Sequence, residues 1–303
     1  MLAPTKSIAS STAIDLSRLP APDIIEPLDF EVILADRKAD FLARFPQFSA
    51  FVESDPVMKL LEAAAYQELI LRQRINDAAH GVMIAFAKGA DLDNLAAFFG
   101  VVRRVITPAN EETGALAVME SDDDLRRRVL LAPDSYSVAG PTAAYQFHAL
   151  SASGDVADVS AISPAPGEVL ISVLSRQGDG TASPELLDLV EAVVGADDVR
   201  PLTDQVSVQS VEIVDFAVTA KLTIYRGPDA DLILKSAQDG LTAMLKESRL
   251  IGRDIARSAI FQALHTAGVQ SVALEDPVSD IVIGDTQVAA ATAVAVTIAG
   301  VAE

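Results

Sequence analysis

The residues that decide the fold class lie at 216–245, which read FAVTAKLTIYRGPDADLILKSAQDGLTAML. Apolar residues occupy every second position from Phe216 to Ile224, and this period predicts a strand with one buried face. After Pro228-Asp229 the apolar residues recur every three or four positions instead, which predicts an amphipathic helix. A strand followed directly by such a helix is typical of mixed α and β structure.

The same mixture of strands and helices extends in both directions from this stretch, from about residue 155 to the last residues of the chain. Val169, Ile171 and Val173 share one face of a predicted strand, and Ser183-Pro184 and Gly195 bracket a predicted helix. Further elements are expected as a helix over 254–268 and strands over 269–274 and 292–299. The predicted order is β-β-α-β-β-α-α-β-β, which indicates two related α+β units in tandem.

The hydrophobic period before residue 150 is helical. We predict one helix over 29–45 and a longer one after Asp55, because aspartate is a good N-cap and proline, here Pro56, is tolerated at the first helical position. Glu68 and Arg72 are spaced to form an ion pair on this helix. Apolar residues cover much of its circumference, so it is either an ordinary bundle helix of its own domain or a helix shared with other chains.

Three shorter helices are expected before residue 150: one capped by Asp91 and ending at Gly100, one starting at Ser121, and one over 143–150. The predicted fold class is therefore α+β, with an N-terminal, mainly helical region followed by a C-terminal region of tandem ββα-type α+β units. We divide the chain into an extended arm and helical region at 1–110, a helical connecting region at 111–150 and the tandem α+β region at 151–303. The last of these is expected to fold without the N-terminal half.

The N-terminal segment, residues 1–28, is expected to be extended because it contains four prolines, Pro4, Pro20, Pro22 and Pro27. Its apolar residues need a surface, which is either its own domain or a partner chain. The candidate partner-binding residues on this arm and the helices after it are Leu16, Leu19, Ile24, Ile25, Leu28, Phe30, Leu60, Leu61, Leu69, Leu71 and Ile75.

Composition excludes several classes of protein. Half of the residues are hydrophobic, so the chain can build a core, and its formal net charge of −20 opposes binding to nucleic acid or to anionic membrane surfaces. The chain has no cysteine, which excludes disulfides, a thiolate nucleophile and Cys-ligated metal sites. The first residues lack the apolar region of a secretion signal, and the apolar stretch at 288–302 is too short to span a membrane.

The sharpest charge cluster is Asp122-Asp123-Asp124 followed by Arg126-Arg127-Arg128. On a helix capped by Ser121, each aspartate faces the arginine four residues later, and the acids lie at the positive end of the helix dipole. Adjacent helical residues point about 100° apart, so the three carboxylates cannot converge on one metal ion. This cluster is therefore interpreted as structural.

No other motif indicates a cofactor, metal or catalytic site. Asp91, Asp93 and Asn94 resemble the start of a calcium loop, but Ala96 and Val102 occupy the positions of its required glycine and glutamate. Residues 178–181, Gly-Asp-Gly-Thr, lack the Gly-Lys-Ser/Thr of a phosphate loop and fit a turn. The histidines, His80, His148 and His265, have no second ligand at metal spacing. We expect no enzyme, no cofactor and no metal; the alternative is a soluble α+β enzyme or ligand-binding module whose site is built from distant residues.

Several short blocks follow one another along nearly the whole chain. They are DLSRLP (15–20), EPLDFE (26–31), ESDPV (53–57), GADLDNLA (89–96), ESDDDLRRR (120–128), GPT (140–142), SPAPG (163–167), VRPLTD (199–204) and IARSAI (255–260). In this order they resemble the J proteins of phage tail baseplates, which are wedge components of contractile-tail phages and related phage-derived particles.

The resemblance implies a structural role in the virion tail baseplate, assembled in the cytoplasm of a host bacterium, with no catalytic residues. It implies that the helical region at 1–110 enters a wedge-core bundle with a smaller partner of the tail protein I family. The C-terminal domains would contact other copies of the chain and close wedges into a ring around the tail hub. A lysozyme-related wedge protein and the hub and sheath proteins are further implied partners, and the ring would rearrange when the sheath contracts.

Overall fold

The computed structural model describes residues 22–48, 51–227 and 229–302. The chain divides into two compact units, one from residues 1–103 and 121–130 and the other from residues 104–120 and 131–303. Two of the candidate partner-binding residues, Leu16 and Leu19, lie outside the described residues.

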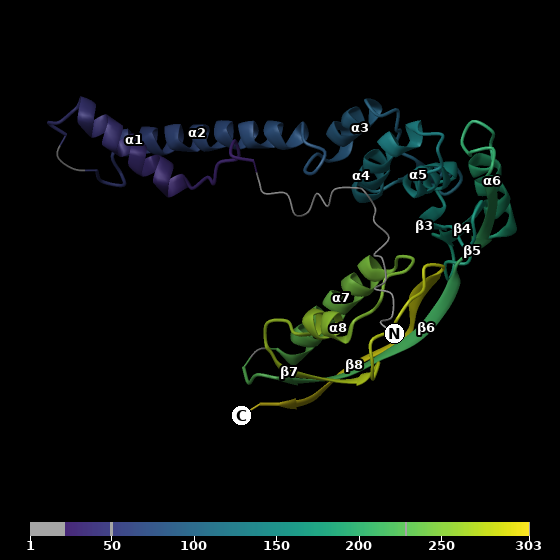
Figure 1. Cartoon of the computed structure of the whole chain (residues 1–303). Coiled ribbons are helices and arrows are strands. Elements are labelled where there is room, and N and C mark those ends of the chain that lie inside the picture. The colour runs from purple at the N-terminus through teal and green to yellow at the C-terminus, as the bar shows by residue number, and fades with distance from the viewer. Residues whose placement is uncertain (1–21, 49–50, 228, 303) are drawn as a thin grey trace, which may run out of the picture. The chain divides into compact units, whose positions relative to one another are not determined.

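The first unit is helical. Its helices α1 (Phe30–Arg44) and α2 (Pro56–Gly81) lie side by side (Figure 1). α2 begins directly after its predicted cap, Asp55, and α1 begins one residue after Asp29, where the first helix was predicted to start. The Asp29 carboxylate accepts the N–H groups of Glu31 and Val32, and the Asp55 carboxylate accepts the Val57 N–H at 2.8 Å. These bonds satisfy amide groups that have no partner in the first turn of a helix. The core between α1 and α2 is small and contains Ile33, Leu34, Met58 and Ala65.

The same unit contains α3 (Gly89–Ala97) and most of α4 (Asp122–Leu131). The prediction that Asp91 caps α3 is wrong. The helix begins two residues earlier, at Gly89, so Asp91 lies inside its first turn, and the helix ends at Ala97, before Gly100. Gly89 adopts a φ of 52°, a left-handed conformation that glycine tolerates, and this sharp turn starts the helix early.

The second unit contains two sheets and a short hairpin, β1 (Val105–Thr107) with β2 (Val118–Met119). The first sheet has the order β3-β4-β5, from β3 (Val156–Ile162), β4 (Glu168–Ser175) and β5 (Gln205–Ser210). β3 and β4 are antiparallel, whereas β4 and β5 are parallel and joined through α6 (Pro184–Val194). Its core joins strand residues such as Ile171 and Val173 to Val190 on α6 and Tyr145 on α5 (Thr142–Ala152), which follows the 3-10 helix at Ala132–Tyr136.

The second sheet has the order β7-β6-β8. Its central strand β6 (Glu212–Ile224) pairs antiparallel with β7 (Val269–Asp276) and parallel with β8 (Gln287–Val301). Helices α7 (Ala230–Ser248) and α8 (Arg257–Leu264) cover one face of this sheet (Figure 1). The alternating residues predicted to face inward are all buried against these helices: Phe216, Val218, Ala220, Leu222 and Ile224.

The α+β class and the predicted order of elements from β3 onward are confirmed. The two sheets differ in topology, however, because the second strand in sequence is central in the first sheet and the first strand is central in the other. The two tandem units therefore share a composition of elements but not one fold. Alternation along a strand predicts which face is buried, but it does not specify which strand lies beside it.

The helix predicted over 254–268 is shorter in the structure, at Arg257–Leu264. Its first predicted residues are held in other bonds: the Asp254 carboxylate accepts the Ile283 N–H at 2.6 Å, and Ile255 pairs with Ile281 as an isolated β-bridge. In the described part of the chain, no helix is both long enough and apolar enough to cross a lipid bilayer.

Candidate functional site

One exposed apolar surface of the helical unit lies on α2. Leu60, Leu71 and Ile75 are 71%, 61% and 58% exposed. Ala64 and Ala78 are exposed between and after them at helical spacing. We call these residues, Leu60, Ala64, Leu71, Ile75 and Ala78, the α2 stripe. Its spacing places it on one face of the helix, away from the buried positions Met58 and Ala65.

The opposite face of α2 is covered by α1. Three of the candidate partner-binding residues, Phe30, Leu61 and Leu69, are partly buried in this contact. They therefore belong to the core of their own unit, whereas Leu60, Leu71 and Ile75 do not. The structure thus separates the candidates on these two helices into a packed set and an exposed set.

A buried asparagine fixes the segment that precedes α1. Asn76 is 5% exposed, and its side-chain amide donates to the Glu26 carbonyl oxygen at 2.9 Å while its Oδ1 accepts the Glu26 N–H at 3.2 Å. Ile25 and Leu28 are half-buried beside it and Ile24 is exposed. The described part of the arm, residues 22–28, therefore packs on its own domain. Sequence reasoning missed Asn76, although an asparagine seven residues after the buried-face residue Leu69 was a usable signal.

Charged groups strengthen the same contact between helices. Glu68 pairs with Arg37 of α1 and, as predicted, with Arg72 four residues later at 2.7 Å. The hydrogen bond from Arg37 lowers the pKa of Glu68; burial opposes this, and the charges of Arg37 and Arg72 lower it further. The carboxylate is thus ionised at neutral pH and holds the two helices together.

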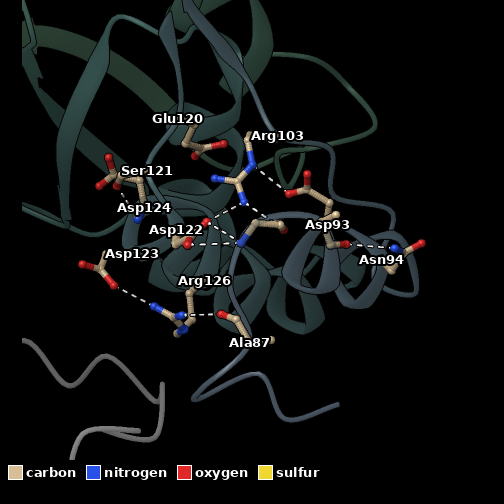
Figure 2. A network of polar contacts seen from close by, with 12 residues as sticks. Ala87, Asp93, Asn94, Arg103, Glu120, Ser121, Asp122, Asp123, Asp124 and Arg126 are labelled. Carbon is tan, nitrogen blue, oxygen red and sulfur yellow. Dashed lines mark hydrogen bonds and ion pairs between the residues drawn. The ribbon is translucent and has the colours of Figure 1, made fainter. Parts of the chain in front are cut away.

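A second polar network joins α3 to α4 (Figure 2). The Arg103 guanidinium donates to Asp93 and to Asp122, at 2.7 Å in each case, and the Asp122 carboxylate also accepts the Gly89 N–H at 3.2 Å. The expected pairing of Asp122 with Arg126 is replaced by this longer-range ion pair. Burial alone would raise the pKa of Asp122, but the bonds from Arg103 and Gly89 and the charges of Arg103 and Arg126 lower it overall.

The arginines of the charge cluster also hold the chain itself. Arg126 pairs with Asp123, three residues earlier, at 2.6 Å and donates to the carbonyl oxygen of Ala87 (Figure 2). It also donates to the carbonyl oxygen of Ile84. The predicted cap is confirmed, since the Ser121 hydroxyl accepts the Asp124 N–H at 3.2 Å. The interpretation of this cluster as structural therefore fits the contacts that its residues make.

The described residues contain no group of three or more histidine, aspartate or glutamate side chains that could hold a metal ion. His148 is half-buried on α5, and burial lowers its pKa despite opposing contributions from Ser135 and Asp198. His80 contacts the Phe86 ring, with the ring centroids 5.1 Å apart.

One groove in the second unit has the size of a ligand pocket. It has a volume of about 680 Å³ and lies between α7 and the first halves of β6 and β8. Its lining is mostly apolar and includes Phe216, Leu245 and Val294, with Lys246 and Arg249 on the α7 side. The loop that contains Asp179 also contributes, and the Asp179 carboxylate accepts the Thr181 N–H at 2.9 Å in the predicted turn.

The sequence matches domains and a protein that are already known. Residues 53–110 match the baseplate J-like N-terminal domain, residues 137–210 the baseplate J-like central domain, and residues 216–297 the C-terminal domain of baseplate J-like proteins. Baseplate protein J of Escherichia phage P2 is 48% identical over 283 residues, which cover 90% of this chain and 94% of that protein. With the family's three domains in order and a relative of this similarity along nearly its whole length, the chain belongs to the baseplate J-like family.

Proposed function

We propose that this chain is a structural protein of the baseplate of a contractile phage-type tail, where it is a component of the wedges. The relationship to baseplate protein J of phage P2 supports a structural role in the tail baseplate and assembly with other baseplate proteins. The observation that carries the wedge role is the α2 stripe, which α1 leaves exposed and which contains three large apolar side chains, Leu60, Leu71 and Ile75.

The energetic argument concerns how much this stripe can contribute to assembly. Burying a leucine or isoleucine side chain is worth about 1.5–3 kcal/mol. Covering Leu60, Leu71 and Ile75, which are more than half exposed, therefore contributes part of the free energy that association with a partner helix requires. Their helical spacing fits such a helix packed along α2. We assign this place to the tail protein I partner, which forms the wedge core with residues 1–110.

The rest of the chain has other tasks under this proposal. Residues 111–150 connect the wedge core to the C-terminal domains, and residues 151–303 contact further copies to close a ring around the tail hub. The lysozyme-related wedge protein and the hub and sheath proteins are neighbours of this ring, which rearranges as the sheath contracts. The chain itself is not an enzyme and needs no cofactor.

The test is co-expression with a tail protein I from the same genome, followed by purification through a tag on this chain. The double variant Leu71→Asp, Ile75→Asp places charge in the stripe at exposed positions, so the fold should persist. We expect the recovered partner to fall by at least about ten-fold, which corresponds to a loss of about 1.4 kcal/mol.

The matched control is Leu232→Asp on α7, where the wild-type side chain is exposed to a similar degree, 68%, in the other unit. This variant should retain the partner. Circular dichroism checks that both variants remain folded. Equal partner recovery with the stripe variant and the control would show that the stripe is not the contact.

A further inference from the structure

Strand β8 forms one edge of the β7-β6-β8 sheet and is 15 residues long. In the described chain its strand partner is β6 alone, so half of its backbone N–H and C=O groups face outward, as at any sheet edge. Its middle residues, 292–295, are all exposed. Such an edge is a ready template for another strand.

Natural proteins usually block an open edge with charge, proline or a short strand. The other edge of this sheet follows that rule: β7 is 8 residues long and ends in Glu275 and Asp276, and Glu275 pairs with Lys221 at 2.6 Å. β8 has none of these three devices, although its pairing with β6 skips one β8 residue at Thr292 and another at Ala299. Its sequence, QVAAATAVAVTIAGV, contains no charged residue and no proline. The difference between the two edges indicates that the β8 edge is kept open for pairing.

The charge of the chain indicates what pairs there. Two copies at a net charge of −20 each repel one another over most of their surfaces. The uncharged β8 edge lets two copies meet without placing acidic side chains opposite each other. A strand that pairs with itself antiparallel also forms a closed two-fold contact, in which both copies use the same residues.

The groove beside α7 gives a second reason to expect a strand of another copy at the β8 edge. Its lining includes Ala289, Thr292 and Val294 of β8. A strand added at an edge gains affinity from backbone bonds and specificity from pockets that receive its alternate side chains. Valine and isoleucine side chains from a second β8 would therefore meet the apolar wall that Leu245 and Val294 give this groove.

We propose that two copies of this chain pair through their β8 edges, antiparallel and centred on the exposed residues 292–295. The pairing joins two three-stranded sheets into one continuous sheet across a two-fold axis. It rests on the proposed wedge role for its purpose, because that role requires contacts between copies through the C-terminal domains, and it specifies which residues make one such contact.

The experiment uses the absence of cysteine from the chain. Single cysteines are introduced into the full chain at Ala293, Ala295 and Thr297, which are exposed on β8. The control is Ser271→Cys, exposed on β7 at the opposite edge. The cysteine variants are mildly oxidised in a buffer with about 0.5 M salt, because the salt screens the repulsion between the negatively charged copies. We expect a disulfide-linked dimer from at least one β8 cysteine, with at least about five times the yield of the Ser271 control, because opposed Cβ atoms on paired strands lie about 5 Å apart.

Sedimentation equilibrium of the full chain supplies the second measurement. Ala295→Lys should raise the dissociation constant of the dimer by at least about ten-fold, because a lysine on an open edge opposes pairing, whereas Ser271→Lys should leave it unchanged. Equal crosslinking from both edges, or equal effects of the two lysines, would overturn the pairing. So would an Ala295→Lys variant that still self-associates but releases another protein of the co-expressed complex, since the edge then binds that protein.

The two proposals can fail separately. If the β8 cysteine variants crosslink better than the Ser271 control but the chain never purifies with tail protein I, the pairing stands and the wedge role is wrong. If tail protein I is retained while β8 crosslinks no better than β7, the wedge role stands and the β8 pairing is wrong.

Discussion

Asp122 connects three segments of the helical unit, because it lies in the first turn of α4, binds Arg103 and accepts the N–H of Gly89 at the start of α3. A carboxylate in such a position replaces the water that would otherwise solvate the arginine and the amide. The Arg103 side chain is 12% exposed, and its guanidinium donates to Asp93, to Asp122 and to the Gly89 carbonyl oxygen. The join between α3 and α4 is therefore sensitive to the charge of one side chain.

We predict that Asp122→Asn lowers the free energy of unfolding by about 1 kcal/mol at pH 7, since it weakens a partly exposed charged pair but preserves size. The pKa of Asp122 is lowered in the folded chain, so its contribution is present above the unfolded value of about 3.9 and is lost as pH falls through the folded value. Urea unfolding at pH 7, 5 and 3 should show the wild-type and variant curves converging at the lowest pH.

The control for this prediction is Asp123→Asn, whose wild-type side chain is 93% exposed. It should change stability by no more than a few tenths of a kcal/mol. A gap between wild type and Asp122→Asn that stays constant from pH 7 to pH 3 would contradict the role given to the carboxylate charge.

Single residues differ in how well sequence predicts them, and the difference follows from sequence separation. The caps Asp29, Asp55 and Ser121 were predictable because each binds an amide two or three residues later. The bond from Asn76 to Glu26 spans 50 residues and that from Arg103 to Asp122 spans 19. No local pattern specifies such partners, and the same tertiary geometry drew Asp122 away from the pairing expected within its helix.

Helices α7 and α8 approach closely at Gly240. A Cβ atom at this position would lie 2.8 Å from the Ala263 carbonyl oxygen, a backbone atom that cannot move without shifting α8. Glycine inside a helix normally costs about 1 kcal/mol relative to alanine. Here that cost is offset by the tighter contact between the helices that cover the β7-β6-β8 sheet.

We predict that Gly240→Ala destabilises the second unit by about 2 kcal/mol, because overpacking outweighs the gain in helix propensity. Gly300→Ala is the matched control, since a Cβ there meets no atom within 4 Å. Thermal unfolding followed by circular dichroism should show a lower midpoint for the first variant alone. A raised midpoint for Gly240→Ala would mean that the helices relax apart without cost.

At the scale of elements, hydrophobic period predicted helices and strands well, and it failed where backbone contacts intervene. The α8 prediction began too early because Ile255 pairs with Ile281, which no periodicity reveals. For α2 the period showed an apolar surface on several sides, but it did not show which part α1 covers. The α2 stripe became visible only once Leu61 and Leu69 were placed in the core.

At the scale of the whole molecule, the hydrophobic cores place the start of the C-terminal folding unit near residue 131, whereas the sequence pattern placed it at residue 151. The core of the β3-β4-β5 sheet includes Leu131 and, on α5, Tyr145, Ala149 and Leu150. Tyr145 also donates to the Asp204 carboxylate at 2.9 Å, which ties α5 to the loop before β5. A fragment that starts at residue 151 lacks these side chains, whereas one that starts at residue 131 keeps them.

We predict that fragment 131–303 unfolds in a cooperative thermal transition and that fragment 151–303 unfolds at a lower temperature, because exposing its core strands to water removes the apolar burial supplied by α5. Differential scanning calorimetry of the two fragments measures both midpoints. Equal midpoints would place α5 outside the cooperative unit. An aggregated 131–303 fragment would contradict its independence from the helical unit.

The family was the feature that the sequence predicted best, because the blocks that carry the resemblance are spread over nearly the whole chain, even though each block is a weak signal alone. The charge and the lack of cysteine, both properties of the whole chain, excluded classes of function without any structural detail. What the sequence did not reveal is which surfaces folding leaves open. The sequence alone does not show that the residues of the α2 stripe and of the β8 edge stay exposed, because this depends on which elements pack beside them.

The exposed α2 stripe also has a consequence for producing the protein. Chains that carry an uncovered apolar row are prone to aggregate and are recognised by chaperones and proteases. If a partner covers the stripe, as proposed, the yield of soluble chain should follow the supply of that partner, and chains made in excess should be the ones that aggregate or are degraded.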